Sequence, residues 1–203
     1  MPISSFGLRA LIISTVLSLG GGGLLHATSV VAPSFAELVA EAETIVRARV
    51  LSVRAAWVDS PQGRVIKTYV TFATQRQLKG RSTPQFTLEL FGGELDGQGM
   101  RIAGLPQFEA GQSEMLFVSG NGVQFCPLVG LMHGRYRIRT DPANAREYLT
   151  RNDGVPLVSE HDVQLPQGAN PLEARTKTVA AALSPLAFEQ RINVELSRRA
   201  TLH

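Results

Sequence analysis

The chain has 203 residues, of which 44% are hydrophobic and 18% are charged, and its formal net charge is +3 at pH 7. This apolar content argues against a disordered protein and predicts one folded domain with appended segments. The basic residues are scattered along the chain rather than grouped with aromatic residues, which argues against a nucleic-acid-binding protein.

The N-terminal residues have the order of a secretion signal. Arg9 lies in a short polar start, an apolar run follows over residues 10–19, and four glycines precede small residues. The run is shorter than the roughly 20 apolar residues of a membrane span, although an uncleaved anchor is the alternative. We therefore predict that residues 1–29 are a signal and that the mature protein is periplasmic or extracellular and not bound to a membrane. The cleavage could follow Ala27, Ser29 or Ala32.

Cys126 is the only cysteine, so no disulfide can form within the chain. It lies in the apolar stretch QFCPL, where a free cysteine commonly behaves as a small hydrophobic residue. We predict that its thiol is buried.

The first elements after the signal are a helix and a bent strand. Ser34 and Glu37 have capping-box spacing, which predicts a short helix over residues 35–42. Residues 44–53 alternate as a strand, with the apolar side chains on the face opposite the arginines. The alternation breaks at Val50 and Leu51, which predicts a bulge or bend.

Two longer strands follow. Residues 65–78 are rich in β-branched and aromatic residues, and residues 85–91 alternate strictly between apolar and polar. The connection between them has the length of a hairpin loop, so we expect the two strands to pair.

The glycine-rich stretch over residues 91–112 raises the question of a phosphate-binding loop. Gly92 and Gly97 have the required spacing, but Gln98 and Gly99 replace the Lys and Ser/Thr of that motif. Ile102 also stands where a dinucleotide motif needs its last glycine. The glycines are therefore interpreted as chain reversals, with a short strand over residues 100–104.

The remaining elements are short strands and then helices. We expect a strand over residues 113–119, a strand pair within residues 126–140, and a hairpin arm over residues 146–151. In the strand pair, the side chains of Arg135, Arg137 and Arg139 are expected to face away from Tyr136 and Ile138. The polar stretch after Gly154 reads as a linker, and helices are expected to start at Asn170 and at Ser184.

Six to eight short strands separated by turn residues predict an antiparallel barrel or sandwich that is closed or nearly closed. The predicted organisation is a signal over residues 1–29, a β domain over residues 34–151, and a linker with a helical tail over residues 152–203.

Four stretches together resemble a family of exported bacterial proteins of unassigned function: ELVAEAETIVRARVLSV, TYVTFATQRQLKG, FGGELDGQGMRIAGLPQFEAGQSEMLFV and VGLMHGRYRI. The resemblance covers residues 34 to about 139. The same order of motifs is more loosely similar to netrin-like modules of the metalloproteinase-inhibitor type. That similarity implies a mainly β, OB-like barrel with a short N-terminal helix and C-terminal helices. The inhibitory mechanism of those modules uses an N-terminal cysteine, which this chain lacks before Cys126.

Catalytic and metal-binding patterns are weak in this sequence. His133 could act in a hydrolase, but no G-x-S-x-G motif accompanies it, and Ser113 and Ser119 read as turn serines. Residues 160–162 hold three metal-ligand types in succession, but adjacent loop residues rarely converge on one ion. We predict no catalytic residue, no metal site and no cofactor.

Trp57, Tyr69, Glu94 and Asp96 are the candidate binding residues, because an aromatic side chain at a barrel mouth can bind a sugar or a peptide. Alternatively, Trp57 covers one end of the core and binds no ligand. The sequence thus favours an exported, non-enzymatic module that binds an unknown protein or polymer. An envelope hydrolase, or an inhibitor or accessory of a secreted metalloprotease, is the alternative function.

Overall fold

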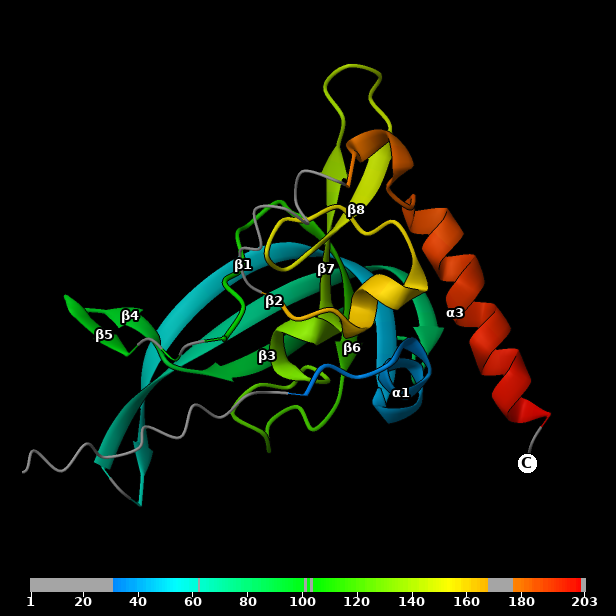
Figure 1. Ribbon diagram of the computed structural model, residues 1–203. Helices are drawn as coiled ribbons and strands as arrows, with labels where there is room; N and C mark the ends of the chain where they lie inside the picture. Colours follow the sequence, from blue (N-terminus) through cyan, green and yellow to red (C-terminus); the bar gives the residue numbers. More distant parts are fainter. Residues whose placement is uncertain (1–30, 62, 101, 103, 168–176, 202–203) are drawn as a thin grey trace, which may run out of the picture.

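The computed structural model describes residues 31–61, 63–100, 102, 104–167 and 177–201 (Figure 1). The predicted signal over residues 1–29 and the helix start at Asn170 lie outside the described residues. The helices and strands are α1 (Phe35–Glu41), β1 (Thr44–Ser60), β2 (Gly63–Lys79), β3 (Gln85–Phe91), β4 (Gly93–Leu95), β5 (Gln98–Met100), β6 (Ser113–Val118), β7 (Arg135–Thr140), β8 (Glu147–Arg151) and α3 (Pro185–Ala200). Short 3-10 helices are η1 (Leu131–Gly134), η2 (Glu160–Gln164) and η3 (Val179–Ala181).

The main sheet is antiparallel and has six strands in the order β3-β2-β1-β6-β7-β8, while β4 and β5 form a separate hairpin. The prediction of a mainly β protein with an antiparallel sheet and a C-terminal helix is therefore confirmed. Within the described residues no ladder joins the outer strands β3 and β8, so closure into a barrel is not confirmed.

Other segments of the chain already bond the outer strands. The side-chain amide of Asn121 accepts from the Glu89 amide and donates to the Thr87 carbonyl along β3, and the Phe91 amide donates to the Phe125 carbonyl. Along β8, the amides of Leu149 and Arg151 donate to the carbonyls of Leu183 and Val155, and the Leu157 amide donates back to the Leu149 carbonyl. Covering an edge in this way protects it from pairing with another strand.

Strand β1 contains the predicted bulge. Its register against β2 shifts between Val50 and Ser52, so Leu51 is the extra residue. The prediction of a bulge or bend at this point is confirmed. The ladder between β1 and β6 runs only from Thr44 to Arg49, so β1 lies between two strands before the bulge and pairs only with β2 after it.

Two clusters of buried side chains cover the two faces of the sheet. One cluster packs α1 and α3 on the sheet through residues such as Leu38, Phe117 and Phe188. The other lies against β1, β2 and β3 and includes Phe72, Leu88 and Cys126. Burial raises the pKa of the Cys126 thiol to about 11, and the prediction of a buried thiol is confirmed.

Two of the three predicted helix starts, at Ser34 and Ser184, are confirmed, and the third lies outside the described residues. Ser34 and Glu37 form a reciprocal capping box at α1, and Ser184 caps α3 with Pro185 in its first turn. The segment after Gly154, expected to be a linker, instead lies against the core, because the side chains of Leu157 and Val163 are buried there.

The expected strand pair within residues 126–140 is a single strand. Gly130 and Leu131 both have φ of 58°, which turns the chain into η1 before β7 begins. The segment that precedes this turn forms only an isolated bridge between Leu128 and Val118. A left-handed pair of residues cannot continue a strand, and this accounts for the error.

Arg135 faces away from Tyr136, as expected, because it lies over the Phe108 ring on the other face of the sheet, but its side chain is completely buried there. Its guanidinium donates to Glu114 from Nη2 at 2.6 Å and from Nε at 3.1 Å, and both side chains are 0% exposed. The group also bonds the Gln107 carbonyl and lies 4.2 Å from the Phe108 ring centre. Burial raises the pKa of Glu114, and the bonds from Arg135 act in the opposite direction.

We expect Glu114→Gln to lower the free energy of unfolding by about 3 kcal/mol, because it leaves the buried Arg135 charge without its counter-charge. Chemical denaturation measures the change. Glu147→Gln is the control, since Glu147 pairs with Arg47 at a partly exposed site and should cost less than about 1 kcal/mol. Equal losses in the two variants would contradict the expectation.

Candidate binding surface

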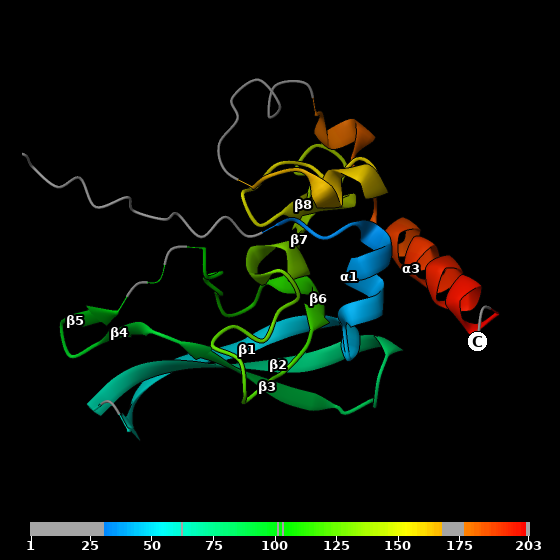
Figure 2. The same cartoon turned by 60° about the horizontal axis from the view of Figure 1, so that its bottom comes forward.

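The second halves of β1 and β2 extend beyond the rest of the sheet. We define the arm as residues 51–60 of β1, residues 63–70 of β2, and the β4–β5 hairpin. The hairpin contacts both long strands, and the whole arm lies on the side of the molecule away from α3 (Figures 1 and 2). Among the described residues, neither α1 nor α3 therefore covers the arm.

Trp57 and Asp96 meet on the arm, although they are far apart in the sequence. Trp57 Nε1 donates to Asp96 Oδ2 at 3.3 Å, and the Arg64 guanidinium lies 5.2 Å from the centre of the indole ring. Asp96 and Gly97 have φ of 54° and 71°, as a tight two-residue hairpin turn requires. The turn thus places the Asp96 carboxylate beside the ring.

Gly93 allows the hairpin to lie close to the long strands. Its φ is 139°, and an added Cβ would come within 2.4 Å of Thr68 Oγ1. No larger residue fits this position without moving the hairpin. The glycines at positions 92, 93 and 97 all have positive φ, in agreement with chain reversal rather than a phosphate-binding loop.

The other two candidate residues lie apart from the Trp57–Asp96 pair. Tyr69 is opposite Arg54 and Glu89 on the neighbouring strands, and Trp57 is opposite Ile66, so Tyr69 and Trp57 occupy opposite faces of the ribbon. Glu94 is exposed on the hairpin, opposite Gly99. The structure therefore brings together two of the four predicted residues.

A hollow of about 260 Å³ lies beside the hairpin on the Trp57 face of the ribbon. Its lining is mainly apolar and includes Val53, Leu90, Phe91, Met100, Leu105 and Phe108. These residues come from strands and a loop that are separate in the sequence. Sequence reasoning missed the hollow because no single segment shows its pattern.

The opposite face of the ribbon carries a shallower groove of about 410 Å³. It lies between the strands and the loop over residues 122–125, where Val123 is 90% exposed and Phe125 is 50% exposed. Lys67 forms an ion pair with Glu89 in its lining. Apolar side chains of the ribbon, such as Val58 and Val65, and of this loop thus line the groove.

The two histidines among the described residues have different surroundings. His133 is buried, with Nδ1 at 3.3 Å from the Val163 carbonyl oxygen and 3.4 Å from Gln167 Nε2. His161 is exposed, with Nδ1 at 3.4 Å from Gln164 Nε2. Backbone and amide groups hold both rings, which is not the base–nucleophile contact that a hydrolase needs.

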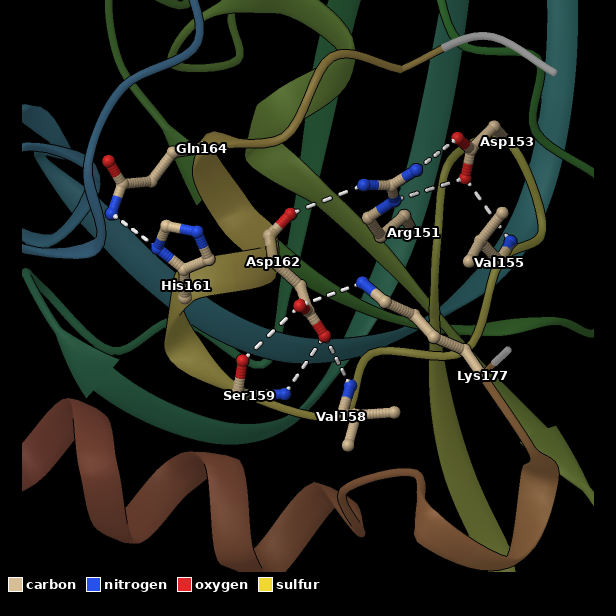
Figure 3. A network of polar contacts seen from close by, with 9 residues as sticks. All are labelled: Arg151, Asp153, Val155, Val158, Ser159, His161, Asp162, Gln164 and Lys177. Carbon is tan, nitrogen blue, oxygen red and sulfur yellow. Dashed lines mark hydrogen bonds and ion pairs between the residues drawn. The ribbon is translucent and has the colours of Figure 1, made fainter. Parts of the chain in front are cut away.

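Asp162 is the centre of a polar network (Figure 3). Its carboxylate accepts from the amides of Val158 and Ser159, at 2.7 and 3.0 Å, and from the Ser159 hydroxyl. Lys177 Nζ lies 2.7 Å from the same group. Burial alone would raise the pKa of Asp162, but Lys177 and the amides together lower it. The carboxylate is thus occupied in holding the segment after Gly154 in place.

No grouping of three or more His, Cys, Asp or Glu side chains suited to a metal ion occurs in the part of the chain that the structure describes. The same residues contain no helix of the length and apolar character that a membrane span needs.

No protein-family model matches this chain, and no curated protein matches its sequence. The resemblance to exported bacterial proteins and to netrin-like modules therefore stays a prediction.

The stability of the protein should fall as acid protonates His133. Burial lowers the pKa of His133, and the Arg151 charge acts in the same direction. The stabilisation by neutral His133 is therefore present above the unfolded value of about 6.5 and is lost as the pH falls through the folded value. We expect His133→Gln to reduce the loss of unfolding free energy between about pH 7 and pH 5. His161→Gln, at an exposed site, should keep the loss, and equal pH profiles for all three proteins would contradict this.

The fluorescence of Trp57, the only tryptophan, should report the contact with the hairpin. Asp96→Ala removes the acceptor of the indole N–H, so we expect emission to shift to the red and quenching by acrylamide to increase. The unfolding free energy should change by less than about 1 kcal/mol, because the bond is exposed. Glu94→Ala removes the same charge from the same hairpin and should leave the emission unchanged; an equal shift in both variants would refute the contact.

Proposed function

We propose that this protein is an exported, non-enzymatic module that binds a protein or polymer through its arm. The observation that carries the proposal is the apolar hollow beside the hairpin, on the face of the ribbon that also carries Trp57. Exposed apolar side chains that gather around a hollow commonly mark an interaction site. Val53, which is 41% exposed, carries the lining of the hollow to the edge of β1.

The chemistry of the arm supports binding rather than catalysis as its role. Trp57 offers an aromatic face, and the contacts of the ring with Asp96 and Arg64 fix it in one orientation. A ring that is held before the ligand arrives loses little conformational entropy on binding. Such a ring can contact a sugar or an apolar side chain.

An OB-like barrel is part of the proposal and rests on the shape of β1. This strand bends at its bulge and pairs with both β2 and β6, as a strand shared by the two halves of a small barrel does. The buried cluster with Phe72 and Leu88 would be the barrel interior. The segments that cover β3 and β8 would then take the place of direct pairing between those strands.

Export rests on the order of residues 1–29, with a short polar start, an apolar run and small residues at its end. An exported chain without a disulfide must rely on its core, and the two buried clusters on opposite faces of the sheet are consistent with that requirement.

The test is affinity capture from the envelope, secreted and cytosolic fractions of a bacterial culture, with the mature chain immobilised. We expect the Trp57→Ala variant to capture about tenfold less partner than the wild type. A buried aromatic contact in an interface is commonly worth more than about 1 kcal/mol of binding free energy. Quantitative mass spectrometry measures the amounts.

Tyr69→Ala is the matched control, because Tyr69 is an aromatic residue on the opposite face of the same ribbon. The Tyr69→Ala variant should capture as much of the partner as the wild type does. A partner that both variants retain equally would contradict binding through the Trp57 face, and a partner found only in the cytosolic fraction would contradict an exported role.

A further inference from the structure

The sheet has a third edge that differs from its two outer ones. The Asn121 amide and the Phe125 carbonyl bond the edge of β3, and the backbone around Leu157 and Leu183 bonds the edge of β8. Strand β1 beyond its bulge has β2 on one side only, because β6 ends its ladder at Arg49. Proteins usually cover such an edge, since its free groups pair readily with another strand.

The backbone groups on this edge can be assigned from the ladder. The Gly92 amide donates to the Ile66 carbonyl, so the backbone groups of Ile66 point toward β3 and away from β1. Trp57 is the partner of Ile66, so its own N–H and C=O point away from β2, to the free edge. The register is regular from Ser52 to Ser60, so Val53 and Ala55 share this orientation. Among the described residues, none of these three residues makes a further backbone hydrogen bond.

The hollow opens on the same face as these residues. Val53 lines it with its side chain and also presents its backbone groups at the edge. A strand added beside Val53 would therefore place every second side chain over the apolar lining. Main-chain pairing together with a side-chain pocket is the usual arrangement in recognition by strand addition.

The opposite face of the same edge carries the positive charge of Arg54. Arg54 is exposed and points to the face away from the hollow, since it lies between Val53 and Ala55. Within the described residues it belongs to no ion pair of 4.0 Å or less. The side chains of an added strand that do not face the hollow would lie beside this guanidinium, so acidic residues fit there.

We propose that the free edge of β1, at Val53, Ala55 and Trp57, binds an extended peptide segment of a partner protein, with apolar residues over the hollow and acidic residues beside Arg54. The inference rests on the proposed binding function and selects a protein over a polymer as the ligand. A second copy of this chain fits less well, because antiparallel pairing of two such edges would bring the two Arg54 side chains near each other.

The test uses a fluorescein-labelled peptide, Glu-Val-Glu-Leu-Glu-Val-Glu, and fluorescence anisotropy with the mature chain. Two versions of the peptide carry N-methyl groups on alternate amides, one on the odd and one on the even positions. Only one set of amides can face β1, so one version should lose binding and the other should keep it. A peptide with Lys in place of Glu should bind at least about tenfold more weakly.

Three variants of the protein complete the test. Val53→Pro removes an N–H group from the free edge without removing a bond to β2, and it should abolish binding. Arg54→Glu should weaken binding about tenfold, and Arg81→Glu, the same charge reversal in the exposed loop before β3, should leave it unchanged. Circular dichroism and Trp57 emission check that each variant is folded.

Three outcomes would overturn the inference. Equal binding of the two methylated peptides would show that main-chain pairing is not involved. A wild-type dimer in sedimentation that Val53→Pro converts to a monomer would assign the edge to a second copy. Absence of binding at about 1 mM peptide would reject the peptide ligand; capture that depends on Trp57 would in that case still support the proposed binding function.

Discussion

The requirement that every strand edge find hydrogen-bonding partners governs this structure. Strands β1 and β2 have 17 residues each, whereas β6 has six and β3 has seven. The shorter strands cannot accompany the longer ones to their ends, so the sheet narrows to a two-stranded ribbon. A side-chain amide and loop carbonyls satisfy the outer edges of the sheet, and the ribbon is left as the one place in the described sheet where backbone groups and an apolar hollow meet.

The bulge at Leu51 lies between the part of β1 that belongs to the sheet and the part that belongs to the ribbon. Before it, Val46 and Ala48 belong to a core cluster that the sheet encloses; after it, Val53 lies at the surface and lines the hollow. A bulge increases the local twist of a strand, which turns the ribbon away from the helices. The same residue that ends the packed part of β1 thus begins its exposed part.

Polar groups fix the surroundings of the sheet. The buried pair of Glu114 and Arg135 joins β6 to β7, and the Gln107 carbonyl attaches the loop that lines the hollow to the same guanidinium. Asp162 and Lys177 hold the segment after Gly154 against the core. Buried charges of this kind add little net stability when paired, but they disfavour alternative arrangements in which either partner is left alone.

Local pattern alone predicted the features that depend on neighbouring residues: the capping box at Ser34, the strand over residues 85–91, the bulge at Leu51 and the start of α3 at Ser184. Trp57 and Asp96 were also selected from the sequence, but separately, because nothing in the chain indicates that Gly93 allows the hairpin to lie on β2. The burial of Arg135, the packing of Leu157 and Val163, the hollow and the free edge of β1 were decided only by tertiary structure. Each depends on where a partner segment ends or turns, and such distances between segments leave no periodic signal in the sequence of either one.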